Sequence, residues 1–217
     1  MADDFYDMLN KYQSDVIDFL MKNPNRLIII RGVKFIGKTT MIYKIFEQEY
    51  QVPIIYHTGC DPTKRQIAYK YFEKILNKYA NQNCLVVLDE FYMPDICEYF
   101  RQHPNFKVLL FVNSHELNYT EFKTFNLFDV YEQYKKEFFK DSNIKWQDKN
   151  IRELKYIMEH PNMKQSEFEA TQNNFEKLRS SSNNTQTKVK YLNTITTETI
   201  TFDSAIKAHT DIVDLAQ

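Results

Sequence analysis

Apolar residues follow two alternating patterns along the first half of the chain: short continuous runs, and positions three or four residues apart. The continuous runs are short and rich in β-branched residues, which predicts strands buried on both faces of a sheet; they cover 27–31, 52–57, 84–88 and 107–112. Helical spacing covers 4–22, 39–49, 63–79 and 94–101. Strands that alternate with helices predict an α/β domain with a parallel sheet.

The pattern changes after residue 140. A fifth candidate strand, 124–127, and a helix, 128–139, come before the change. Charged segments with helical spacing then cover 149–160, 164–179 and 203–215, and a polar stretch covers 180–187. We therefore predict two units, a core at 1–140 and a small helical C-terminal lobe at 141–217.

One segment points to a ligand. Residues 32–40 read Gly-Val-Lys-Phe-Ile-Gly-Lys-Thr-Thr and fit the phosphate-binding pattern G-x-x-x-x-G-K-[ST] at every fixed position. The segment lies between a predicted strand and a predicted helix, which is the context that the motif requires. Its main chain is expected to surround a nucleotide's phosphates; the binding residues are Gly32, Val33, Lys34, Phe35, Ile36, Gly37, Lys38, Thr39 and Thr40.

Two side chains of this segment have predicted roles of their own. Lys38 is expected to reach the β- and γ-phosphates, and the hydroxyl of Thr39 is expected to bind Mg²⁺. A chance match to the motif is the alternative. It is disfavoured because the chain contains only three glycines and two of them, Gly32 and Gly37, occupy the fixed positions.

The apolar run 84–88 ends on two adjacent carboxylates, Asp89 and Glu90. A parallel strand delivers its last residues to the same sheet edge at which a phosphate loop opens. Asp89 is therefore expected to hold Mg²⁺ through water, and Glu90 to polarise the water that attacks the γ-phosphate. The alternative is a pair of solvated carboxylates in a turn.

The next strand ends at Asn113. A phosphate loop, a strand ending Asp-Glu and a following strand ending in Asn together resemble the additional-strand, catalytic-glutamate division of P-loop ATPases, which includes the AAA+ and STAND proteins. The resemblance implies a three-layer fold with strand order 5-1-4-3-2, ATP and Mg²⁺ as cofactors, and a sensor role for Asn113. Segments 174–178, 195–200 and 211–215 are also similar, over short stretches, to the lid of clamp-loader subunits.

The same resemblance implies an arginine finger, which AAA+ assemblies usually take from a neighbouring subunit of a homo- or hetero-oligomer. No arginine lies between residues 114 and 125, where such a residue often occurs. The candidates are Arg101, Arg152 and Arg179. A chain that lacks its finger is expected to hydrolyse nucleotide slowly by itself.

Charge and composition narrow the classes of function that remain. The net charge of −1 gives no overall attraction to nucleic acid, and the basic residues between 135 and 155 alternate with acidic ones, so a mixed-charge surface is favoured over a DNA-binding one. No apolar run approaches the roughly 18 residues of a membrane span, and the acidic N-terminus is unlike a secretory signal. We therefore expect a cytoplasmic protein; if a virus encodes it, we expect it in the cytoplasm of the host cell. Neither the cysteines nor the histidines show zinc-ligand spacing.

These patterns favour an ATPase of AAA+ type that acts in DNA replication or in mobile-element or phage DNA transactions. A viral DNA-packaging ATPase is an alternative, since a minimal core with an Asp-Glu-Phe motif at 89–91 also fits it. A STAND-type switch is a further alternative, favoured by Lys34 within the loop and by the missing finger. A small-molecule kinase is less favoured, because no arginine-rich lid follows the loop.

Overall fold

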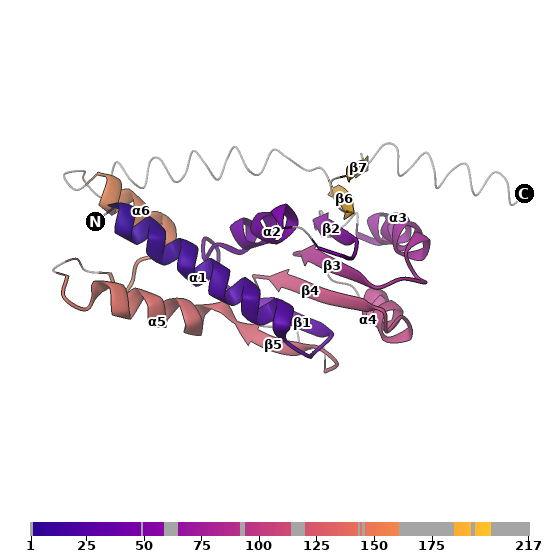
Figure 1. Cartoon of the computed structure of the whole chain (residues 1–217), viewed down its shortest axis with the longest axis horizontal. Coiled ribbons are helices and arrows are strands. Elements are labelled where there is room, and N and C mark those ends of the chain that lie inside the picture. The colour runs from indigo at the N-terminus through magenta and orange to yellow at the C-terminus, as the bar shows by residue number, and fades with distance from the viewer. Residues whose placement is uncertain are drawn as a thin grey trace, which may run out of the picture.

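A computed structural model gives the fold (Figure 1) and describes residues 2–48, 50–58, 65–91, 94–113, 120–142, 144, 146–160, 185–191 and 194–200. The helices are α1 (Ala2–Lys22), α2 (Lys38–Glu47), α3 (Arg65–Lys78), α4 (Pro94–Gln102), α5 (Leu127–Phe139) and α6 (Ile151–Glu159). The strands are β1 (Leu27–Arg31), β2 (Ile54–Thr58), β3 (Cys84–Asp89), β4 (Phe106–Val112), β5 (Lys123–Asn126), β6 (Thr185–Tyr191) and β7 (Thr194–Ile200).

The strands form one sheet in the order β5-β1-β4-β3-β2-β6-β7. Its first five strands are parallel and stand in the predicted order 5-1-4-3-2. The sheet then continues through β6 and β7, both of which pair antiparallel. The predicted fold class, a three-layer α/β domain with a parallel sheet, is confirmed, with two strands more than the sequence indicated.

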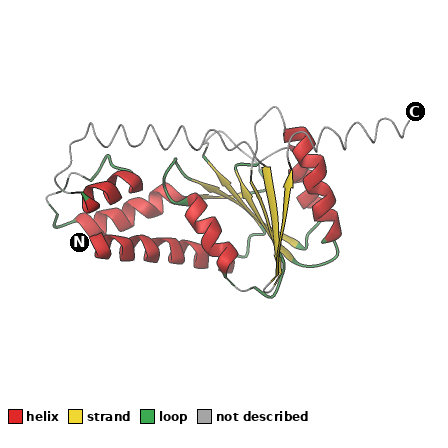
Figure 2. Ribbon diagram, turned by 90° about the horizontal axis from the view of Figure 1, so that it is seen from above, coloured by secondary structure: helices red, strands yellow, loops and turns green. Residues whose placement is uncertain are grey.

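Helices cover both faces of the sheet (Figure 2). One buried core joins one face to α1, α2, α5 and α6, and a second core joins the opposite face to α3 and α4. Alternate residues of each central strand enter the two cores: in β4, Leu109 and Phe111 face the first, whereas Val108, Leu110 and Val112 face the second. A strand that packs on both faces needs apolar residues at successive positions, which explains the continuous apolar runs.

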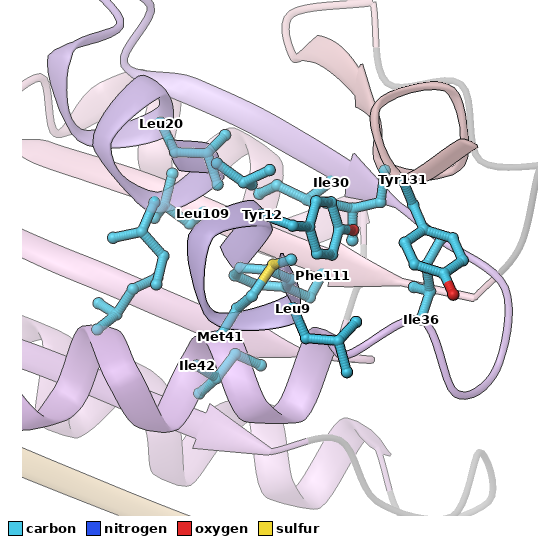
Figure 3. Packing of buried hydrophobic residues seen from close by; sticks show 14 of the residues in the cluster. Leu9, Tyr12, Leu20, Ile30, Ile36, Met41, Ile42, Leu109, Phe111 and Tyr131 are labelled. Carbon is cyan, nitrogen blue, oxygen red and sulfur yellow. The ribbon is translucent and has the colours of Figure 1, made fainter. Parts of the chain in front are cut away.

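Helix α1 packs along its length on the first core (Figure 3), where Leu9 and Tyr12 meet Met41 of α2 and Phe111 of β4. Its buried residues recur at three- and four-residue steps, as the sequence predicted. Among the helices that the structure describes, none combines the length and the apolar character that a bilayer span requires.

The sequence indicated a helical C-terminal lobe and assigned no strand to it, whereas Thr185–Tyr191 and Thr194–Ile200 form the strands β6 and β7. The β-branched residues that recur through both strands, such as Thr187, Val189, Ile195 and Thr197, explain this result, because such side chains favour extended backbone. α6 confirms the predicted helix at 149–160, and the helices predicted at 164–179 and 203–215 lie outside the described residues. The division into two domains at residue 140 stays a prediction; α6 packs against α1 of the predicted core.

A histidine of the sheet is buried against the second core. His57 of β2 is fully buried and stacks on Phe72 at 4.3 Å between ring centroids, with the edge of Phe91 at 4.4 Å. Burial among these rings lowers the pKa of His57 from its ordinary value to about 3. The imidazole is therefore neutral in the folded protein at neutral pH.

We expect His57 to make stability depend on pH below neutrality. The unfolded chain takes up a proton near pH 6.5 that the folded chain does not bind until about pH 3, so the free energy of unfolding falls as pH falls through this window. Between pH 7.5 and pH 5 the loss is about 2 kcal/mol. Urea unfolding at both pH values should show a smaller loss for His57→Leu than for the wild type. His160→Leu, at an exposed site, is the control, and an equal loss in wild type and His57→Leu would contradict the prediction.

Candidate nucleotide-binding site

The site forms where three parallel strands end side by side. Arg31 at the end of β1 pairs with Val112 of β4, and Asp89 at the end of β3 pairs with Phe111. Main-chain hydrogen bonds continue just past these ends: the Gly32 N–H donates to Val112 O at 3.1 Å, and the Glu90 N–H donates to Phe111 O at 2.8 Å. The start of the phosphate loop, Glu90 and the residue after β4, Asn113, are therefore held at one sheet edge.

The phosphate loop needs glycine at both fixed positions. A Cβ on Gly32 would lie 2.6 Å from Cγ2 of Ile36 and 3.0 Å from Cδ1 of Leu127, so a larger residue would displace the loop's packing. Gly37 has a φ of 93° and forms the N-cap of α2, a conformation that favours glycine. The N–H groups in the first turn of α2, which includes Thr39 and Thr40, have no side-chain cap, and α2 carries no acidic residue there. Such a helix start favours an anion.

The ammonium of Lys38 lies inside the site, with 6% of the residue exposed. Its Nζ donates to Gly32 O at 2.7 Å, to Val33 O at 2.9 Å and to Oδ1 of Asn113. Three acceptors match the three N–H donors of an ammonium. The lysine is thus bound to the opening residues of its own loop and to the end of β4.

Asn113 joins Lys38 to the acidic strand end. Its Oδ1 accepts from Lys38, and its Nδ2 donates to Oε1 of Glu90. Asp89, the neighbour of Glu90, is 9% exposed and lies close enough to Tyr56 for its charge to add to the rise that burial causes in the pKa of Tyr56. Lys38, Asn113 and Glu90, which the sequence placed on three separate elements, therefore form one hydrogen-bonded chain; their catalytic roles stay predictions.

Two residues of the site have unusual backbone conformations. Phe35 in the loop has a φ of 66°, and Glu90 has a φ of 55°; within the described residues these are the non-glycine residues with positive φ. Such conformations cost of order 1 kcal/mol each and tend to occur at functional sites. At Glu90 the main-chain bond to Phe111 helps to hold the conformation.

Helix α6 brings an arginine to the loop. The guanidinium carbon of Arg152 lies 3.9 Å from the ring centroid of Phe35. The helix start is fixed by a capping box, in which Asn150 accepts from the Glu153 N–H and Glu153 accepts from the Asn150 N–H. Lys135 of α5, 2% exposed, donates to the carbonyls of the preceding loop at residues 147 and 149 and anchors it.

Of the three arginines that the sequence offered as fingers, the structure thus places Arg152 on the phosphate loop. Arg101 forms ion pairs with Glu98 and Glu121 on exposed side chains, and Arg179 lies outside the described residues. Helical spacing predicted α6 but could not place it beside the loop.

Sequence reasoning missed Gln13 of α1. A Cβ on Gly37 would lie 3.1 Å from Nε2 of Gln13, which puts this amide against the helix end of the loop. The available signal was a glutamine at an apolar position: Gln13 falls in the stripe of buried residues that includes Leu9, Tyr12 and Val16.

Comparison with known families agrees with the geometry. A family model described as an AAA domain matches residues 24–103, which hold β1, the phosphate loop, α2 and the Asp89–Glu90 strand end, and stop before Asn113. The match indicates an AAA-like P-loop ATPase domain. A comparison with curated proteins found no match.

Proposed function

We propose that this chain binds ATP with Mg²⁺ at the sheet edge and hydrolyses it, as a member of the additional-strand, catalytic-glutamate division of AAA-like ATPases. The observation that carries the proposal is the hydrogen-bonded chain Lys38–Asn113–Glu90 beside the start of α2. It unites a phosphate-binding cation, a polar amide and a carboxylate that can act as a base. The AAA-domain match over residues 24–103 supports it.

Phosphate binding uses groups that are already in place. The N–H groups at the start of α2, which lack a side-chain cap, can donate to phosphate oxygens. The buried ammonium of Lys38 can exchange the carbonyls of Gly32 and Val33 for phosphate oxygens. Since Asn113 contacts both Lys38 and Glu90, a change in the position of the lysine is passed directly to the carboxylate. Asn113 thus has the contacts that a sensor of the γ-phosphate requires.

The residues present fit Mg²⁺, because the buried carboxylate of Asp89 is a hard oxygen donor at the sheet edge where the phosphate loop begins. Asp89 and the Thr39 hydroxyl would hold the ion, which when bound neutralises charge on the phosphate oxygens. Glu90 accepts a proton from the attacking water.

Arg152 is the arginine that this proposal assigns to the site, since it stacks on Phe35 of the loop. An arginine from the same chain supplies positive charge without a neighbour. The finger from a second subunit that the sequence suggested is the alternative, and the mass of the protein with and without ATP would distinguish a monomer from a ring.

The proposal is tested by titrating the wild type and Lys38→Ala with ATP and Mg²⁺. Loss of a buried, charge-assisted contact to phosphate is expected to weaken binding by at least about 30-fold. Lys44→Ala is the matched control, because Lys44 lies on the same helix and its Nζ donates to Asn10. Equal affinity in the wild type and Lys38→Ala would overturn the assignment.

A nucleotide-dependent switch of STAND type is the second candidate. It is favoured by the contact between Glu90 and Asn113, because this hydrogen bond engages the oxygen of the proposed base. A switch would release its product far more slowly than it binds ATP, whereas a motor would turn over continuously, so rapid steady-state turnover would exclude the switch.

The proposed roles in DNA replication, in phage or mobile-element transactions and in DNA packaging depend on a DNA contact. Within the described residues, three lysines of the basic stretch 135–155 form ion pairs with neighbouring carboxylates: Lys135–Glu132, Lys140–Glu137 and Lys149–Glu153. The paired charges favour a mixed-charge surface, as the sequence indicated. Turnover that DNA does not change would argue against these roles.

A further inference from the structure

We propose that Gln13 of α1 determines the base specificity of the nucleotide site, with its carboxamide bound to the exocyclic amine of adenine. The inference rests on the proposed nucleotide-binding function and deepens it. It assigns a role to the N-terminal helix, which lies outside the 24–103 match.

The first observation is the burial of a polar group in an apolar stripe. Gln13 is 6% exposed and lies between the buried residues Leu9, Tyr12, Val16 and Ile17 of α1. Within the part of the chain that the structure describes, its amide makes no hydrogen bond. Among the described residues, the amide nitrogen and oxygen of Gln13 do not belong to the fully buried polar atoms that lack a partner, so the tip of this side chain reaches solvent. The amide is therefore open to a ligand at the phosphate loop, whereas a leucine at this position would only continue the stripe.

The second observation is the position of that amide. Its Nε2 would lie 3.1 Å from a Cβ on Gly37, the residue that caps the ten-residue helix α2. Cδ1 of Ile151 would lie 3.9 Å from the same point. A donor from α1 and an apolar side chain from α6 thus approach the phosphate loop at its helix end.

The direction of a bound nucleotide follows from the other end of the loop. Lys38 Nζ, the group expected on the β- and γ-phosphates, binds the carbonyls of Gly32 and Val33 and the side chain of Asn113. With the phosphates held there, the proposal puts the nucleoside beside Gly37, where Gln13 and Ile151 lie. An apolar side chain can pack on the face of a base while a carboxamide binds its edge.

The chemistry of the amide favours adenine. A carboxamide offers an acceptor and a donor side by side. Its oxygen can accept from the exocyclic amine of adenine while its NH₂ group donates to a neighbouring ring nitrogen. α1 and α6 pack together, and Tyr6 of α1 donates to Glu159 of α6, so both sides of this subsite are held in position. The amide can therefore discriminate between bases without a movement of either helix.

The test compares ATP with purine riboside triphosphate, which differs from ATP by the missing exocyclic amine. Equilibrium affinities are measured with Mg²⁺ for the full chain as wild type, Gln13→Leu and Gln13→Met. The wild type is expected to bind ATP about tenfold more tightly than the analogue, which is the effect of one hydrogen bond to a buried group. Both variants are expected to bring that ratio close to one.

Gln102→Leu is the matched control, because this exposed glutamine of α4 bonds to Glu98 and should leave the ratio unchanged. If Gln13 only packs beneath Gly37, its replacement would alter both affinities by the same factor and keep the ratio, and this would overturn the inference. Failure of the wild type to bind either nucleotide would instead contradict the proposed function itself. Circular dichroism of each variant verifies that it is folded.

Discussion

Replacing Glu90 with glutamine is expected to slow ATP hydrolysis by at least about 100-fold while leaving ATP binding within a few-fold of the wild type. Glutamine keeps an oxygen that can accept from Nδ2 of Asn113, so the hydrogen-bonded chain to Lys38 is retained. It loses the charge and the basicity that a proton acceptor needs. Single-turnover measurements with excess protein report this chemical step apart from product release.

Glu98→Gln is the control for this experiment, because Glu98 is an exposed residue of α4 that forms an ion pair with Arg101. Its hydrolysis rate should match that of the wild type. Should Glu90→Gln bind ATP and still hydrolyse it within about threefold of the wild-type rate, Glu90 would not be the base. The carboxylate of Asp89 would then be the next group to test.

The closeness of Lys38, Glu90 and Asn113 could be predicted from sequence because it follows from strand order and direction alone. Once three apolar runs are assigned to one parallel sheet, the residues after them must meet at one edge. Their hydrogen bonds could not be predicted, since the φ of 55° at Glu90 and the buried position of Lys38 depend on the neighbouring strands.

The contributions of α1 and α6 to the site could not be predicted from the sequence, for a different reason. Periodicity shows which face of a helix is buried but does not show which other element covers that face. Gln13 and Arg152 reach the phosphate loop because α1 and α6 pack on the same side of the sheet as α2. A glutamine within an apolar stripe was the one local sign of this arrangement.

The hairpin β6–β7 shows the limit of reading strands from hydrophobicity. Neither strand has the continuous apolar run of β1, β3 or β4, because β6 and β7 extend the sheet beyond its central, doubly covered strands. Such strands can be largely polar, and their Thr, Val and Ile content is then the remaining signal. That signal was weaker than the polar, low-complexity character of 180–187.

Replacing Phe111 with alanine is expected to lower the free energy of unfolding by about 3–5 kcal/mol. Phe111 is fully buried in β4, where its side chain packs among Leu9, Tyr12 and Met41 (Figure 3), and alanine would leave a cavity between the sheet and α1. Urea unfolding gives the change, provided that the dependence on urea concentration is the same in both proteins. Phe128→Ala, at a residue 46% exposed on α5, should cost less than about 1 kcal/mol.

The same variant links the core to the site, because the carbonyl of Phe111 accepts the Glu90 N–H at 2.8 Å. The main-chain hydrogen bond does not involve the ring. Under conditions in which Phe111→Ala is folded, we therefore expect it to bind ATP with the affinity of the wild type. Saturating ATP should then raise its stability by the same amount as it raises that of the wild type, since the gain depends on affinity and concentration alone. A smaller gain in Phe111→Ala would mean that the ring positions Glu90 and Asn113 as well as filling the core.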